Sequence, residues 1–104
     1  MELPMYAVIA VDLDGTLCYG SEKDPEPIIE NIEVVKRLYR AGYQIVIYTS
    51  RHPSHRKETE HWLQNNDVWY NTLIMGDRKI EFDLLIDDKA INANYFFRNW
   101  RKLI

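Results

Sequence analysis

Three short apolar runs, each ending in acidic or hydroxyl-bearing residues, most constrain what this chain can fold into. They cover residues 6–11, 43–48 and 83–87. The first is continuously apolar and rich in β-branched residues, as expected of a strand with both faces buried. It leads into VDLDGTL, where Asp12 and Asp14 stand one residue apart. Acidic residues are poor strand formers and are costly to bury unpaired, so their position calls for a functional explanation.

The segments between these runs carry helical signals. Apolar residues recur at helical spacing over 28–41, and Gly42 follows at a position where a C-terminal glycine is common. A second helix is expected to begin at Pro53 or Ser54 and to end near residue 66. Each predicted strand in this part of the chain is therefore followed by a predicted helix.

Two further elements complete the predicted order. Residues 70–75 form a weaker third strand, and a helix over 92–101 is expected to bury Phe96, Phe97 and Trp100. Strands that alternate with helices in this way predict an α/β fold. Its sheet is expected to be mostly parallel, with helices on both faces.

Composition narrows the function classes. The chain has 104 residues, so residues 1–104 are expected to form a single domain. Its 46% hydrophobic and 28% charged residues exclude a disordered chain, and a net charge of −3 gives no general attraction to nucleic acid. Cys18 is the single cysteine, which excludes an internal disulfide and favours a cytoplasmic setting. The N-terminal run lacks a basic region and is interrupted by Asp12, so neither a signal peptide nor a membrane segment is expected.

The polar ends of the three runs are expected to meet, because ligands bind outside the carboxyl ends of the strands in parallel α/β sheets. Asp12, Asp87 and Asp88 offer hard oxygen ligands, which suit Mg²⁺, and a cation would relieve the repulsion between them. Asp12 and Asp14 point to the same side of an extended backbone, so one can attack while the other handles a proton. Thr49 and a lysine could donate hydrogen bonds to phosphate oxygens.

Each of these features has a simpler explanation when it is taken alone. An Asp-x-Asp pair is often a turn or a cap, and Thr49 could end a strand. Asp87 and Asp88 could cap the helix that follows them. Their shared position at the ends of apolar runs favours one common site.

The ordered set of motifs resembles the haloacid dehalogenase (HAD) superfamily of phosphotransferases. The resemblance rests on DLDGT at 12–16, the apolar run that ends at Thr49, a lysine, and the acidic pair of IDD at 86–88. It spans about residues 8–90 and implies a Rossmann-like three-layer sandwich with a mostly parallel central sheet. Because residues 17–27 leave room only for a short flap, the chain looks like a small phosphatase-like member with no cap domain.

The resemblance also implies roles for individual residues. Asp12 would attack phosphorus to form an aspartyl-phosphate, and Asp14 would protonate the leaving oxygen and then activate water. Thr49 would bind the phosphoryl group. The other phosphate-binding candidates are Thr16, Ser50 and Arg51. The candidates for holding Mg²⁺ are Asp12, Asp14 through its backbone carbonyl, Asp87 and Asp88.

The lysine of the set is expected to be Lys79. It precedes the strand that carries the acidic pair, so it could reach back over the phosphate. A proline follows this lysine in small capless members, whereas Ile80 stands here. Arg78 and Lys89 are the competing cations.

A basic cluster follows Thr49 at the rim of the predicted site, formed by Arg51, His52, His55, Arg56 and Lys57. It could be a solvated helix start that nearby glutamates partly neutralise, or Arg51 could hold a second anionic group of the substrate. The three histidines lack the spacing of a zinc site. The three tryptophans, Trp62, Trp69 and Trp100, are expected to be core or subunit-contact residues, and a homo-oligomer suits a chain of this size.

Together these features predict a Mg²⁺-dependent phosphatase. The expected partner is a phosphorylated small molecule, either a sugar phosphate or another metabolite, and no membrane partner is expected. Two alternatives stay open: a nucleic-acid 3′-phosphatase, and a non-hydrolytic phosphoacceptor or scaffold protein. Receiver domains also place acids, Mg²⁺, a hydroxyl and a lysine around a phosphorylated Asp. Their acidic pair precedes that Asp in the chain, whereas here the order is reversed.

Overall fold

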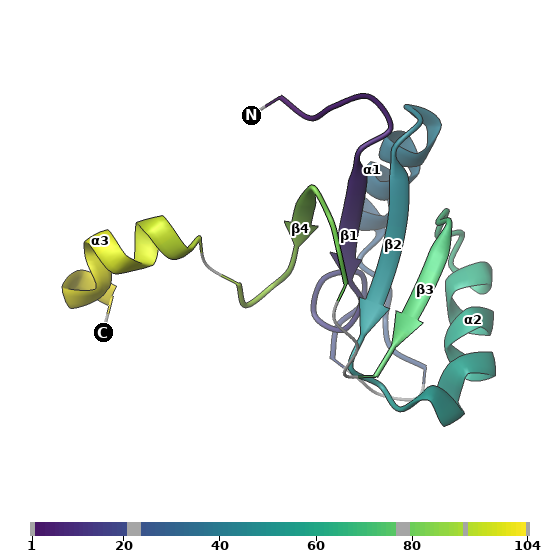
Figure 1. The fold of residues 1–104 in the computed structure, drawn as a ribbon. Helices are drawn as coiled ribbons and strands as arrows, with labels where there is room; N and C mark the ends of the chain where they lie inside the picture. Colours follow the sequence, from purple (N-terminus) through teal and green to yellow (C-terminus); the bar gives the residue numbers. More distant parts are fainter. Residues whose placement is uncertain (1, 21–23, 77–79, 91, 104) are drawn as a thin grey trace.

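The strands form one parallel sheet, and the first predicted strand is one of its inner strands. The computed structural model describes residues 2–20, 24–76, 80–90 and 92–103. Its four strands are β1 (Val8–Asp12), β2 (Gln44–Thr49), β3 (Thr72–Met75) and β4 (Leu84–Ile86). They are ordered β3-β2-β1-β4 and all pairs are parallel (Figure 1). The predicted α/β class with a parallel central sheet is therefore confirmed, and within the described residues no cap domain interrupts it.

Two helices connect the first three strands, close to the predicted positions. They are α1 (Ile29–Arg40) and α2 (Arg56–Asn65), and a short 3-10 turn, Pro53–His55, leads into α2. In α1, Glu30 lies in the first turn and Arg40 in the last, where each charge is favourable towards the helix dipole. Gly42 has a φ of +96°, the left-handed conformation that ends helices and favours glycine.

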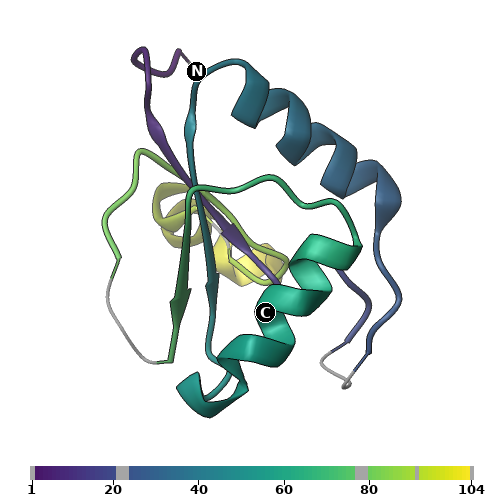
Figure 2. The ribbon, with the colours of Figure 1, turned by 90° about the vertical axis from the view of Figure 1, so that its right-hand side faces the viewer.

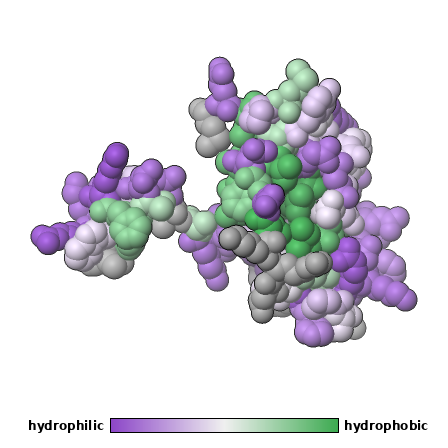
Figure 3. Space-filling model, viewed as in Figure 1, coloured by the Kyte–Doolittle hydropathy of each residue, from purple (hydrophilic) through white to green (hydrophobic). Residues whose placement is uncertain are grey.

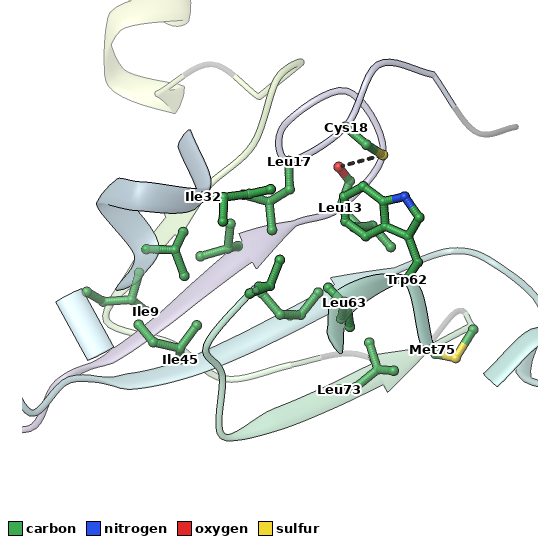
Figure 4. Packing of buried hydrophobic residues seen from close by; sticks show 14 residues of the cluster. Ile9, Leu13, Leu17, Cys18, Ile32, Ile45, Trp62, Leu63, Leu73 and Met75 are labelled. Carbon is green, nitrogen blue, oxygen red and sulfur yellow. Dashed lines mark hydrogen bonds between the residues drawn. The ribbon is translucent and has the colours of Figure 1, made fainter. Parts of the chain in front are cut away.

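Both of these helices cover the same face of the sheet (Figure 2). This follows from the topology, since β1 to β2 and β2 to β3 step across the sheet in the same direction and such crossovers are right-handed. The core lies between this face and the two helices (Figure 4). Its sheet side is built from Ile9, Val11, Ile45, Ile47, Leu73 and Met75, and its helix side from Ile32, Val35, Trp62 and Leu63.

The opposite face of the sheet has no helix packed on it in the described ranges. It presents side chains that alternate with those of the core, namely Val8, Ala10, Val46, Tyr48, Ile74 and Leu85. We call this surface the open sheet face. The chain returns from β3 to β4 on this side, through a connection that includes residues 80–83 (Figure 2). The prediction of helices on both faces is thus met on one face only.

The C-terminal helix α3 (Ala93–Leu103) forms where a helix was predicted, but it does not enter the core. It lies beyond β4 and apart from the rest of the molecule (Figure 1). Phe97 is 74% exposed and Trp100 is 46% exposed, so the predicted burial of these side chains is wrong within the single chain. The amphipathic pattern was real, but it did not specify which surface the apolar side would cover.

None of the described helices has the length and apolar character needed to cross a membrane.

Candidate active site

A pocket of about 620 Å³ lies at the carboxyl edge of the sheet, where the three predicted polar clusters meet. All four strand ends contribute to it. It is lined by Asp12, Asp14, Tyr48, Thr49, Ser50, Gly76, Asp87, Asp88 and Lys89. The structure therefore brings together the side chains that the sequence placed at separate strand ends.

The turn after β1 holds the first two aspartates. Thr16 donates a hydrogen bond from Oγ1 to Oδ2 of Asp12, at 3.2 Å. Gly15 has a φ of +88°, and a Cβ at this position would overlap the carboxylate of Asp88. The glycine therefore serves two needs at once, a left-handed turn and the close approach of the acidic pair.

Asp14 is held by two neighbours from the end of β2. Arg51 donates to its carboxylate from Nη2 at 2.6 Å and from Nε at 3.1 Å, and Thr49 donates from Oγ1 at 3.2 Å. The Arg51 side chain is largely buried, and it also reaches Thr59. Arg51 was predicted as a substrate-binding residue, but here its guanidinium grips the proposed acid/base instead.

Asp87 is fixed from the opposite side of the pocket by Tyr48. The Tyr48 hydroxyl donates to Oδ2 of Asp87, and the backbone N–H of Lys89 donates to Oδ1 at 2.8 Å. These two hydrogen bonds lower the pKa of Asp87, and the one from the Tyr48 hydroxyl has the larger effect. Asp87 therefore stays ionised, as a metal ligand must.

Three of the carboxylates are close enough to share one cation. Asp12, Asp87 and Asp88 each offer an oxygen, and these oxygens all lie within 4.8 Å of one another. Burial, and then the charge of Asp87, raise the pKa of Asp12 to about 7. A cation would offset this repulsion and keep Asp12 ionised, so the donor set fits Mg²⁺, a hard cation with oxygen ligands.

The remaining predicted residues take different places. Thr49 and Ser50 line the pocket, whereas Thr16 and Arg51 do not line it and each contacts an aspartate that does. The predicted phosphate-binding Lys79, and its competitor Arg78, lie outside the described residues. The other competitor, Lys89, lines the pocket.

Sequence reasoning missed Tyr48 and Gly76. Tyr48 was read only as part of an apolar strand, yet its position beside Thr49 sends its side chain to the other face of β2, towards Asp87. Gly76 has a φ of +87° and donates its backbone N–H to the carbonyl of Thr49 at 2.9 Å. The signal that could have identified Tyr48 is the alternation of side chains between the two faces of a strand.

Most of the predicted basic cluster is engaged by acids in the structure. Arg51 pairs with Asp14, and Arg56 pairs with Glu60 at 3.3 Å. The ring of His55 lies 3.4 Å from the carboxylate of Glu58. Of the two interpretations of this cluster, these contacts fit the helix start that nearby glutamates partly neutralise.

Cys18 lies buried behind the site. Its Sγ faces the carbonyl oxygen of Leu13 (Figure 4). It also faces the carbonyl oxygen of Gly20 and the carboxylate of Asp14. Burial, with the charge of Asp14 second, raises the pKa of the Cys18 thiol to about 11. A neutral, buried thiol fits a packing role rather than that of a nucleophile.

Comparison with known proteins identifies the family. The family model for haloacid dehalogenase-like hydrolases matches residues 9–94, so the chain belongs to this family. The match covers all four strands except Val8, the first residue of β1, and it includes all the carboxylates of the pocket. No curated protein sequence matches the chain closely enough to count as a relative.

Solved structures share the fold at low sequence identity. A conserved protein from Bacteroides thetaiotaomicron has a TM-score of 0.70 at 20% identity, covering 94% of this chain and 92% of that one. A crystal-structure target from Vibrio cholerae has a TM-score of 0.61 at 23% identity, covering 94% and 99%. A chain of a Pnkp1/Rnl/Hen1 complex has a TM-score of 0.63 at 19% identity, covering 99% of this chain but 36% of that one.

Proposed function

We propose that this protein is a Mg²⁺-dependent phosphatase that hydrolyses a phosphomonoester through an aspartyl-phosphate on Asp12. The observation that carries the proposal is the shared pocket. Asp12 and Asp14 enter it from the central strand, and Asp87 and Asp88 enter it from the neighbouring strand. Membership of a hydrolase family and this arrangement of carboxylates support the same reaction class.

Asp12, Asp87 and Asp88 would hold Mg²⁺, joined by the backbone carbonyl of Asp14. When bound, the cation supplies positive charge to phosphate oxygens and to the clustered carboxylates. The residues around these ligands restrict their positions, since Thr16 binds Asp12 and Tyr48 binds Asp87. Such outer contacts orient ligands before a metal arrives.

In the proposed first step, an oxygen of Asp12 attacks phosphorus and the bond from phosphorus to the leaving oxygen breaks. Asp14 delivers a proton to that oxygen. In the second step Asp14 takes a proton from water, and the water oxygen attacks phosphorus, which releases inorganic phosphate and restores Asp12. Thr49 and Ser50 are close enough to the pocket to donate hydrogen bonds to phosphoryl oxygens.

The contact between Arg51 and Asp14 adds a requirement to this mechanism. With three donor atoms around its carboxylate, Asp14 faces the end of β2. To transfer a proton it must turn from Arg51 towards the leaving oxygen. Arg51 therefore acts as a positioning residue that holds Asp14 between turnovers.

A small phosphorylated metabolite, such as a sugar phosphate, is the substrate class that the site favours. Arg51 and Arg56, two basic side chains near the pocket, are paired with acids, and the chain has a net charge of −3. A long polyanion needs a basic surface to bind, and among the described residues that line the pocket Lys89 is the one basic side chain. The likeness in fold to a chain of the Pnkp1/Rnl/Hen1 complex, which is an RNA repair complex, makes a nucleic-acid 3′-phosphate the second candidate.

Turnover of a substrate panel tests the proposal. Phosphorylated sugars, nucleotides and oligonucleotides with a 3′-phosphate are assayed with Mg²⁺ and with EDTA. Wild type is expected to release phosphate only with Mg²⁺, and Asp12→Asn to lose at least about 10³-fold in turnover. Asp24→Asn, which alters an exposed carboxylate, is the matched control and should keep full activity.

Two results would contradict the proposal. Equal turnover by Asp12→Asn and wild type would remove Asp12 as the nucleophile. A stable phosphorylated wild-type protein without turnover would favour a phosphoacceptor protein instead.

A further inference from the structure

The helix α3 carries an apolar stripe that no other described part of the chain covers. Phe96, Trp100 and Leu103 are spaced so that they lie along one side of the helix. None of the residues of α3 is buried, and Leu103 is 43% exposed. A stripe of this size is unusual on the surface of a protein that works alone in water.

The body of the protein has a second uncovered apolar surface, the open sheet face. Its apolar residues Val8, Val46, Ile74 and Leu85, one from each strand, are partly exposed. Figure 3 views the molecule from this side and shows one apolar patch over the sheet and another on α3. The chain therefore has an unpaired helix stripe and an unpaired sheet surface that a helix could cover.

The charges of these two parts are complementary. The helix α3 contains Arg98, Arg101 and Lys102 and no acidic residue. The whole chain has 13 basic and 16 acidic residues, so the part outside α3 has a net charge of −6. Glu81 and Asp83 are exposed in the segment that leads to the open sheet face. A basic helix is thus attracted to the acidic body of another copy.

We propose that the chain forms a symmetric dimer in which α3 of each copy packs across the open sheet face of the other. This inference is independent of the proposed function. In the single chain α3 lies beyond the edge strand β4 and apart from the sheet (Figure 1), and none of its residues is buried. Reciprocal exchange gives each helix a sheet and each sheet a helix, and it closes with twofold symmetry.

The areas available are adequate for a stable dimer. An aromatic side chain buries about 150–250 Å² when it is fully covered. Two helices, each with two aromatic side chains and a leucine in the stripe, together with the two sheet faces that they cover, reach the range of roughly 1,200–2,000 Å² that stable interfaces bury. Trp100, at the centre of the stripe, is the expected anchor of the interface.

The position of the interface brings it next to the pocket. Tyr48 belongs to the open sheet face, and its hydroxyl contacts Asp87. A helix that packs on this face would therefore cover the ring that holds one of the proposed metal ligands. The dimer would supply the helix layer that the single chain lacks on this side.

The first test measures the mass of the full chain in solution by light scattering and by sedimentation over a range of concentrations. Wild type is expected at twice 12.4 kDa. Trp100→Glu should weaken the dimer by at least about thirtyfold, as for an anchor residue. Asn94→Glu, which adds the same charge to the opposite side of α3, is the matched control and should remain dimeric. A monomeric wild type, or a dimer that Trp100→Glu leaves intact, would overturn the proposal.

The second test identifies which surface α3 touches. A photoreactive phenylalanine analogue replaces Trp100 in a mixture of ¹⁵N-labelled and unlabelled chains, and mass spectrometry identifies the cross-linked peptides. Mixed-isotope links from α3 to peptides that contain 44–49 or 80–86 are expected. Links within one chain, or links between two α3 helices, would overturn the proposal. So would a monomer that binds vesicles of anionic lipid, because the basic helix would then be a membrane contact.

Discussion

The two strand ends that supply the carboxylates differ in how firmly they are held. β1 pairs with a strand on each side, and its residues Ile9, Ala10 and Val11 are fully buried. β4 has three residues, pairs only with β1 in the described sheet, and keeps all its side chains partly exposed. The proposed nucleophile therefore stands on the rigid centre of the fold, whereas Asp87 and Asp88 stand on its edge.

This difference indicates that the residues on β1 and those on β4 contribute to different steps, bond making and metal binding. Groups that take part in bond making need fixed positions, which a buried strand provides. Ligands on an edge strand depend more on their own side-chain contacts, as Asp87 does on Tyr48. A bound cation would join the edge to the centre, so the substitutions below should act on turnover at β1 and on metal affinity at β4.

The largest effect is expected at the centre, from Asp14→Asn. The amide cannot exchange a proton with the leaving oxygen or with water, so kcat should fall by about 10²–10⁴-fold. The loss in kcat/KM, which covers the steps up to release of the leaving group, should be smaller for a substrate with an acidic leaving group, such as a nitrophenyl phosphate, because that group needs less protonation. An equal loss in kcat/KM with both kinds of substrate would contradict the role of Asp14 in protonating the leaving oxygen.

At the edge, Asp87→Asn should act through the metal. Removing one charged ligand should raise the Mg²⁺ concentration for half-maximal activity by at least about tenfold. Calorimetric titration of the protein with Mg²⁺ alone should show the same weakening. If Asp87→Asn instead lowers kcat at saturating Mg²⁺ and leaves Mg²⁺ affinity unchanged, the division between centre and edge is wrong.

A smaller effect of the same kind is expected from Tyr48→Phe. The ring stays in place while the hydroxyl that holds Asp87 is lost, so Mg²⁺ affinity should fall by about two- to tenfold. Tyr70→Phe removes the hydroxyl of another half-buried tyrosine, which does not line the pocket, and is the matched control. Titration with Mg²⁺ of both variants would show whether the Tyr48 contact matters for the ligand.

The smallest effect concerns stability without metal. Folding raises the pKa of Asp12 from 3.8 to about 7, so between these pH values the folded state holds a proton that the unfolded chain releases. The contribution of Asp12 to stability therefore falls as pH rises from about 4 to 7. In EDTA, Asp12→Asn should melt above wild type at pH 8, and this advantage should shrink towards pH 4. A difference in Tm that does not change with pH would contradict the shift.

The strand ends could be predicted from the sequence because each one combines two strong local signals, an apolar run and a polar residue directly after it. A β-branched run that stops at an aspartate predicted both the strand and the position of Asp12. Apolar runs that stop at a polar residue did the same for Thr49 and Asp87. The partners of these residues could not be predicted in this way. Whether Arg51 binds substrate or Asp14 depends on the distance between two strand ends, which no local pattern contains.

The C-terminal helix shows the same limit at the scale of the fold. Its spacing predicted a helix with an apolar side, and α3 has that form. Burial depends on which surface lies opposite, and the pattern of Phe96 and Trp100 is the same whether they cover their own sheet or the sheet of another copy. The sequence pattern does not say which surface covers the apolar side of a helix. For α3 we infer that this surface belongs to another copy of the chain.

The most direct test of the central claim is to trap the phosphorylated residue. During single turnover with an active substrate, the reaction is quenched with borohydride, which reduces an aspartyl-phosphate to homoserine, and the digested peptides are analysed by mass spectrometry. The account predicts homoserine at position 12 in wild type and none in Asp12→Asn. Homoserine at position 14, 87 or 88, or turnover without any reduced aspartate, would contradict it.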